Sequence, residues 1–124
     1  MATRNMLRAK LHRLHLTGAN VDYQGSIAID SDLLDAAGII EYEMVHVWNA
    51  SNGERLETYA IAAPAGSGEV CLNGAAARKG APGDIVIVAS FGQMEEAEAR
   101  RHEPTVVYVN ADNSIKRPAL AAAS

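Results

Sequence analysis

Apolar residues along this 124-residue chain fall into short runs that alternate with polar residues or with turn residues. Runs at such close spacing favour a small barrel or sandwich of β-strands. The run at residues 84–90 is the most apolar, and its β-branched residues occupy both faces, which predicts a central strand. We expect strands at residues 6–17, 26–29, 40–48, 55–62, 70–73, 84–90 and 105–109.

The first run, residues 6–17, also fits a helix, because Leu7, Leu11 and Leu14 have helical spacing. Alternate residues from Lys10 onward would instead share one face of a strand. We interpret the run as a strand, in keeping with the strand-like runs that follow it.

Residues 30–38 predict a short capped helix. The side chain of Asp30 or Ser31 can accept hydrogen bonds from the free N–H groups at its start. Gly38 can take the left-handed conformation at its end. We expect a second, single-turn helix within residues 94–101.

Two short segments predict turns. Asn52 and Gly53 separate two strand-like runs and indicate a hairpin, because both residues tolerate the positive φ of a type I′ turn. This hairpin should bring Trp48 and Arg55 close together. The Gly-Ser-Gly segment at residues 66–68 lacks the Gly-Lys-Ser/Thr continuation of a phosphate loop, so we interpret it as a turn.

Length and composition suit one globular domain at residues 1–117, with residues 118–124 as a flexible tail. The net charge of -4 argues against nucleic acid or an anionic membrane as a partner. The chain has neither an apolar run of membrane-spanning length nor the apolar core of a signal peptide at its N-terminus. The single cysteine, Cys71, excludes an internal disulfide, and we expect it to pack as a small hydrophobic residue in a cytoplasmic protein.

Histidines do not indicate a metal site. His12 and His15 are three residues apart, and on a regular strand this spacing points the two side chains to opposite faces. His46 and His102 are isolated in the sequence. We therefore expect no bound metal.

The dipeptide Gly25–Ser26 is the strongest candidate for chemistry. A serine hydroxyl can attack the carbonyl of the preceding residue and turn the amide into an ester, provided that the backbone is bent. Glycine makes that bend easy, because it reaches positive φ with little penalty. Gly-Ser is also common in turns, so the pair alone leaves a plain loop as the alternative.

Six short sequence motifs, one of which contains this pair, occur in order between Leu7 and Arg117. They are residues 10–13 (Lys-Leu-His-Arg), 23–26 (Tyr-Gln-Gly-Ser), 34–38 (Leu-Asp-Ala-Ala-Gly), 58–63 (Thr-Tyr-Ala-Ile-Ala-Ala), 73–77 (Asn-Gly-Ala-Ala-Ala) and 83–87 (Gly-Asp-Ile-Val-Ile). Together these motifs resemble those of the pyruvoyl-dependent aspartate decarboxylases, a family of self-processing enzymes that make β-alanine.

The resemblance implies a six-stranded double-psi β-barrel, mainly β with short helices, assembled as a homotetramer with active sites between subunits. It implies self-cleavage between Gly25 and Ser26 into a β chain of residues 1–25 and an α chain of residues 26–124. Ser26 would become a covalent pyruvoyl group that forms a Schiff base with the substrate, without a metal or pyridoxal phosphate. The implied reaction turns L-aspartate into β-alanine for pantothenate and coenzyme A synthesis.

The resemblance also implies residue roles. Thr58 would donate to the oxyanion formed during cleavage at Gly25 and Ser26, and Tyr59 would protonate the product carbon. Adjacent strand residues point to opposite faces, so using both in one site predicts either a strand irregularity or a site across a subunit boundary. The residues implied to bind the substrate are Lys10, Arg55, Trp48, Asn73, Gly74, Ala75 and Ala76.

Two other functions stay open at this point. One is a pyruvoyl decarboxylase that acts on a different amino acid, although the cations Lys10 and Arg55 favour a substrate with two carboxylates. The other is an uncut barrel that serves as a binding or assembly module, which an intact mass would distinguish. The sequence also leaves open whether a separate maturation protein assists cleavage.

Overall fold

Residues 2–116 are described by the computed structural model, and they form eight strands and three short helices. The predicted fold class, mainly β with short helices, is confirmed. The predicted tail at residues 118–124 lies outside the described residues. In chain order the elements are β1 (Thr3–His15), β2 (Gly18–Asn20), β3 (Ser26–Asp30), α1 (Ser31–Ala37), β4 (Met44–Asn49), β5 (Arg55–Ala63), β6 (Val70–Asn73), the 3₁₀ helix η1 (Gly74–Lys79), β7 (Ile85–Glu95), α2 (Glu96–Arg101) and β8 (Thr105–Tyr108).

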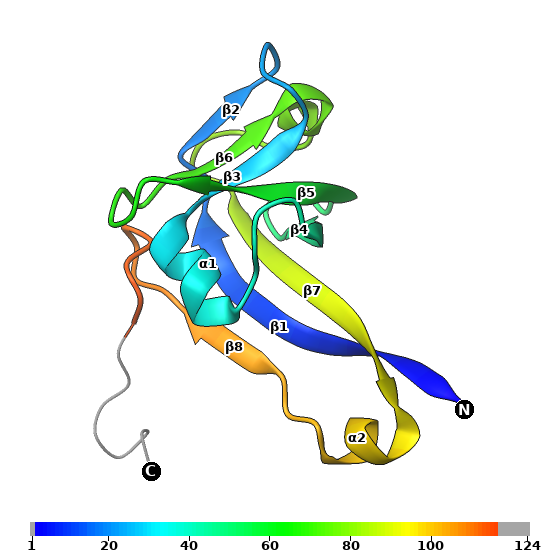
Figure 1. The fold of residues 1–124 in the computed structure, drawn as a ribbon. Helices are drawn as coiled ribbons and strands as arrows, with labels where there is room; N and C mark the ends of the chain where they lie inside the picture. Colours follow the sequence, from blue (N-terminus) through cyan, green and yellow to red (C-terminus); the bar gives the residue numbers. More distant parts are fainter. Residues whose placement is uncertain (1, 117–124) are drawn as a thin grey trace.

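The eight strands form one sheet in the order β2-β6-β3-β5-β4-β7-β1-β8. Strand β7 lies between β4 and β1, which confirms the predicted central position of this apolar run. Strand β5 joins the two halves of the sheet, because residues 55–59 pair with β4 and residues 60–63 pair with β3. Figure 1 shows β1 and β7 as a long twisted pair that extends away from the other strands toward the N-terminus and α2.

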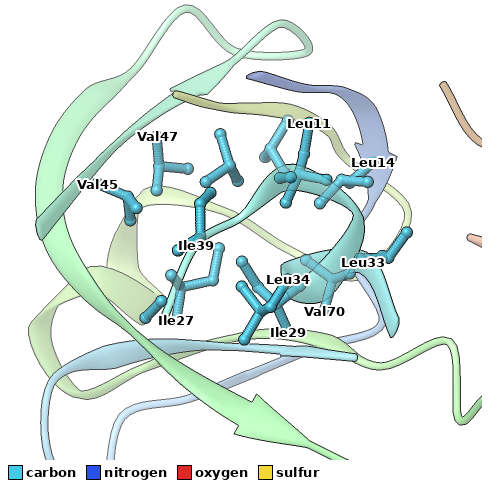
Figure 2. Close-up of a cluster of buried hydrophobic side chains, with 14 of the residues drawn as sticks. Leu11, Leu14, Ile27, Ile29, Leu33, Leu34, Ile39, Val45, Val47 and Val70 are labelled. Carbon is cyan, nitrogen blue, oxygen red and sulfur yellow. The ribbon is translucent and has the colours of Figure 1, made fainter. Parts of the chain in front are cut away.

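The curved sheet encloses an apolar core that takes alternate residues from its strands. Ile27 and Ile29 of β3 and Val45 and Val47 of β4 are each 0% exposed. Figure 2 shows these side chains gathered inside the curve of the ribbon, with Leu34 of α1 close to them. The alternation fixes which residues of each strand face outwards.

A β-bulge interrupts β1 near its end. The register of β1 against β7 shifts between Leu11 and Leu14, and Arg13 has a φ of 62°. Leu11 and Leu14 are both fully buried, so the extra residue moves the alternation by one position. His12 and His15 therefore lie on the same side of β1, and the prediction that they point to opposite faces is wrong.

The hairpin of β4 and β5 brings Trp48 opposite Arg55, as predicted. Its turn differs from the predicted type I′ turn: Gly53 has a φ of 81°, but Asn52 does not have a positive φ. The loop is longer than two residues and is organised by Asn49, whose Oδ1 accepts hydrogen bonds from two loop N–H groups at 2.8 and 3.2 Å.

Strand β4 begins at Met44, four residues later than predicted. The preceding residues form a turn in which Tyr42 has a φ of 71°, a conformation that ends an extended run. Glu43 Oε1 accepts a hydrogen bond from Ile40 N at 3.1 Å and holds this turn closed.

Both predicted caps of the first helix are confirmed. The buried carboxylate of Asp30 accepts from Asp32 N at 2.8 Å, and Gly38 has a φ of 71°. The same carboxylate also accepts from Gly66 N at 3.1 Å and Gly68 N at 2.8 Å, so it ties the predicted turn to α1. Helix α2 begins at Glu96, inside the predicted range.

A half-buried ion pair joins β1, β7 and the turn before β4. Arg8 Nη2 donates to Glu43 Oε2 at 2.6 Å and lies 2.8 Å from Ser90 Oγ, which in turn donates to the Glu43 carboxylate. Burial raises the pKa of Glu43, but hydrogen bonds from Ser90, Ile40 and Arg8 outweigh it and lower the pKa overall. The carboxylate is therefore held in its ionised form.

We expect Glu43→Gln to lower the free energy of unfolding at neutral pH by about 1–3 kcal/mol, because a charge-assisted network is lost. A lowered pKa means that the ionised carboxylate stabilises the fold above its usual pKa, and that this contribution is lost as the pH falls through the folded-state pKa. The difference between parent and variant should therefore shrink in acid. Urea denaturation at neutral and acid pH, at one protein concentration, measures it.

Glu54→Gln is the matched control for this prediction. Glu54 pairs with Lys79 at 2.9 Å, and its side chain is 47% exposed. Solvent screens such a pair, so we expect a change below about 0.5 kcal/mol. A Glu43→Gln penalty that stays constant as the pH falls would contradict the assigned role of the carboxylate.

Candidate active site

Ser26 begins β3 and lies opposite Asn73, the last residue of β6. Asn73 Nδ2 donates to Ser26 Oγ at 3.1 Å, and Ser26 Oγ donates to the Gln24 carbonyl at 3.4 Å. Ser26 is 2% exposed and Asn73 is 3% exposed. The hydroxyl is thus held in a buried place beside the Gly25–Ser26 peptide bond, where water competes poorly with an intramolecular reaction.

The backbone of Gly74 supports the turn before Ser26. Gly74 has a φ of 66°, whereas Gly25 does not have the positive φ that a strained glycine at the bond would show. A Cβ on Gly74 would lie 2.6 Å from both Cα and N of Gly25 and 2.9 Å from Tyr23 O. Only a glycine at position 74 lets the two backbone segments approach this closely.

Trp48 and Arg55, called the Arg55 group below, are two predicted residues that line a hollow together with residues of β1, β4, β5 and β7. The Arg55 guanidinium carbon lies 4.6 Å from the centre of the Trp48 ring, a cation–π contact. The hollow has a volume of about 460 Å³ and is lined by Asn5, His46, Trp48, Arg55, Leu56, Glu57 and Phe91. Its lining does not include Ser26, Lys10 or Tyr59.

The residues of the Arg55 group lie on the outer face of the curved sheet, opposite the core. On β4, Val45 and Val47 point into the core, so Trp48 points outwards. Arg55 is opposite Trp48 in register and shares its face. Tyr59, four residues further along β5, lies on the same face.

Ser26 and Asn73, together called the Ser26 group, lie on the outer face as well. Ile27 and Leu72 are neighbours in register and are both fully buried in the core, so the adjoining pair Ser26 and Asn73 lies on the opposite face. On β1, both neighbours of Lys10 in the chain are fully buried, which directs Lys10 outwards.

Thr58 is the exception among the predicted residues. It is opposite the fully buried Val45 and therefore points to the core side of β5. The register of β4 and β5 is continuous from Arg55 to Tyr59, so the strand irregularity that would place Thr58 and Tyr59 on one face is absent from this segment. The Thr58 and Tyr59 side chains point to different sides of β5.

The pairing of β3 with β5 relates these two residues to the dipeptide. Ile27 is opposite Ala60 in a parallel register. Continuing this register back along both strands puts Tyr59 at the level of Ser26 and Thr58 at the level of Gly25. In this extended register, Thr58 lies on the core side near the level of Gly25, and Tyr59 lies on the outer side near the level of Ser26.

Within one chain, the backbone of Arg55 is well separated from the level of Ser26 along β5. Arg55 and Tyr59 are four residues apart on β5, which corresponds to about 13 Å along an extended strand. This distance exceeds the span of one small amino acid.

The 3₁₀ helix η1 follows Asn73 directly and carries the remaining predicted residues. Gly74 is buried, Ala76 is half-buried against the core, and Ala75 is exposed. That residues 74–76 bind the substrate stays a prediction.

Cys71 is the one neighbour of the Ser26 group that sequence reasoning treated as structural only. Its thiol donates to Asn73 Oδ1 at 3.4 Å. Burial raises the pKa of Cys71, and the nearby Glu69 carboxylate adds to the shift. The signal in the sequence was the two-residue spacing from Asn73, because residues i and i+2 of a strand share a face.

Two further observations concern the whole described part of the chain. Within residues 2–116, no three His, Cys, Asp or Glu side chains are grouped as a metal site requires. Over the same residues, every helix is too short or too polar to cross a membrane.

The chain is similar to known proteins over most of its length. The family model described as aspartate decarboxylase matches residues 1–116. The aspartate 1-decarboxylase of Chromobacterium violaceum is 55% identical over 112 residues, which cover 90% of this chain and 89% of the relative. That of Syntrophobacter fumaroxidans is 54% identical over 110 residues, 89% of each chain. That of Salinibacter ruber is 55% identical over 113 residues, 91% of this chain and 77% of the relative.

We expect Gly74→Ala to slow cleavage at Gly25–Ser26 more than tenfold, because the new methyl group would displace the Gly25 backbone. Gly66→Ala is the matched control. Gly66 has a φ of 78°, so it carries the same backbone penalty, but its Cβ would meet nothing within 4 Å. Intact mass against time measures both variants, and equal slowing in the two would mean that the close approach of Gly74 is unimportant.

Proposed function

Because the chain belongs to the aspartate decarboxylase family, we propose that it converts L-aspartate into β-alanine and carbon dioxide with a pyruvoyl group made from its own Ser26. The observation that carries this proposal is the buried Ser26 hydroxyl, held by Asn73 beside the Gly25–Ser26 bond. Aspartate as the substrate is supported by relatives that share more than half of their aligned residues with this chain.

Cleavage begins when Ser26 Oγ attacks the Gly25 carbonyl carbon. The C–N bond of the amide then breaks, the nitrogen takes a proton, and an ester joins Gly25 to Ser26 Oγ. In the next step the Ser26 Cα proton goes to water and the Cβ–Oγ bond breaks, which leaves a Gly25 carboxylate and a dehydroalanine. Water then replaces the nitrogen, which departs as ammonia, and a ketone remains at residue 26.

Thr58 is our candidate donor to the oxyanion of the first step. Thr58 is half-buried and lies on the core side of β5, and it reaches the level of Gly25 when the parallel register of β3 and β5 is extended back by two residues. A donor in a site without water stabilises developing charge strongly. The opposite face of the same strand is left free for the substrate.

The residues around Ser26 fit a small ketone. Gly74 has no Cβ on the side that faces Gly25, and Asn73 offers an N–H donor at the position of Oγ. Asn73, Gly74, Ala75 and Ala76 would hold the pyruvoyl group and the bound substrate. The group supplies an electron sink for the pair of electrons released when the carboxylate leaves.

Aspartate has two carboxylates, and the outer face offers two cations. Arg55 suits bidentate binding of a carboxylate, and its stacking on Trp48 restricts its rotamers. Lys10 provides a point charge on β1. Tyr59 lies on the same outer face and serves as the acid that protonates the product carbon.

We further propose a homotetramer in which each active site forms between two subunits. The support is the separation of about 13 Å along β5 between the Arg55 group and the level of Ser26. A site between chains would let one subunit supply the ketone and another supply the cations. We place the enzyme in the cytoplasm, where β-alanine enters pantothenate and coenzyme A synthesis.

The decisive test is the intact mass of the purified protein. We expect fragments of residues 1–25 and 26–124, with the larger one blocked to N-terminal sequencing by its ketone. Ser26→Ala should remain a single 124-residue chain without activity, because no hydroxyl is left to attack. A parent chain that stays uncut after prolonged warming would favour the alternative of a binding or assembly module.

Substitutions at neighbouring positions should separate cleavage from turnover. Thr58→Val keeps the β-branched shape but removes the donor, so we expect cleavage to slow by about 10²–10³. Tyr59→Phe should be cut at the parent rate but form β-alanine about 10²–10⁴ more slowly. Intact mass and the yield of β-alanine from aspartate measure the two effects.

Each variant serves as the control for the other. Normal cleavage in Thr58→Val would mean that another group stabilises the oxyanion. Parent-level production of β-alanine by Tyr59→Phe would move the role of acid to a different group. Decarboxylation of another amino acid by the cut parent enzyme, without turnover of aspartate, would favour the other open alternative, a pyruvoyl decarboxylase that acts on a different amino acid.

A further inference from the structure

Two hydrogen bonds connect Cys71 to Ser26 at the bond that we propose is cut, and a third runs from Ser26 to Gln24. The Cys71 thiol donates to Asn73 Oδ1 at 3.4 Å, Asn73 Nδ2 donates to Ser26 Oγ at 3.1 Å, and Ser26 Oγ donates to Gln24 O at 3.4 Å. Every donor in this chain of bonds points the same way. All of these side chains lie on the outer face of β3 and β6.

The amide of Asn73 has a donor end and an acceptor end of nearly the same shape. Either end fits beside Ser26, so the surroundings decide which one faces the hydroxyl. In residues 2–116 the only hydrogen bond to Asn73 Oδ1 comes from Cys71. Without that thiol, the amide can turn so that Oδ1 accepts from Ser26 and its donor faces away.

We propose that Cys71 is a positioning residue for chain cleavage, because its S–H fixes the Asn73 amide with Nδ2 toward Ser26 Oγ. This inference rests on the proposed self-cleavage. Burial raises the pKa of the thiol, which keeps it protonated and able to donate at neutral pH. A thiolate would reverse the preference, since it can only accept.

The orientation matters most in the elimination step. There the Cβ–Oγ bond of Ser26 breaks with its electron pair on Oγ, and Oγ becomes part of the new Gly25 carboxylate. A donor at 3.1 Å from Oγ stabilises this leaving oxygen. With the amide turned, the same oxygen would face Oδ1, and two acceptors would repel each other.

The test compares two pairs of variants that differ only in a donor: Cys71→Ala with Cys71→Ser, and Cys71→Val with Cys71→Thr. Each full-length precursor is made in the cold and then warmed, and its intact mass is followed with time. We expect Ala and Val to be cut about fivefold to tenfold more slowly than Ser and Thr, respectively, as the loss of one hydrogen bond predicts. The second pair keeps the test valid if the first is poorly folded.

Treatment with hydroxylamine measures how much of the ester accumulates, a quantity that a merely structural role of Cys71 would not change. It cleaves the ester and leaves an unblocked Ser26 at the new N-terminus, which is heavier than the ketone form by one ammonia. If elimination is the slowed step, Ala and Val should release more of this fragment than Ser and Thr. Thermal unfolding of the four variants checks that the fold is intact.

The outcomes separate this inference from the proposed function. A parent chain that is never cut overturns both. A parent that is cut, with equal rates within each pair, overturns only the role of Cys71. Slower cleavage without extra ester in Ala and Val also overturns the inference, because the thiol would then act before the elimination.

Discussion

The alternation of core-facing and outward-facing residues along the strands is the constraint on which the site depends. Ile27, Leu72 and Val45 are fully buried and point into the core of the curved sheet. Their neighbours in the chain then have no choice of side. Ser26 and Asn73 face outwards together, and the distance between them is set by the pairing of β3 with β6.

Burial of Ser26 accounts for the order of events in a self-processing enzyme. A hydroxyl that is 2% exposed is inaccessible to an amino acid from solution, but it needs no access to attack its own preceding carbonyl. Cleavage would release the segment before Ser26 and open the space that Gly74 leaves. In the function that we propose, the close backbone contact of Gly74 with Gly25 would serve the precursor first and the substrate afterwards.

The chemistry that we propose is divided between the two faces of β5. Thr58 lies on the core side, toward the level of Gly25, and Tyr59 lies on the outer side with Arg55. This division removes the difficulty that adjacent strand residues cannot share a face. It also directs Tyr59 and Arg55 outwards, where a second copy of the chain would complete the site that we propose.

Local features were determined by the sequence itself. The runs that became β3, β5, β6 and β7, and the caps Asp30 and Gly38, depend on residues close together in the chain. The six ordered motifs indicated the family and most of the candidate site. Only the tertiary structure decided the bulge at Arg13, the start of β4, the face of Thr58 and the contact of Cys71 with Asn73. These depend on which distant segments pair, and the pattern of one segment does not by itself identify its partner strands.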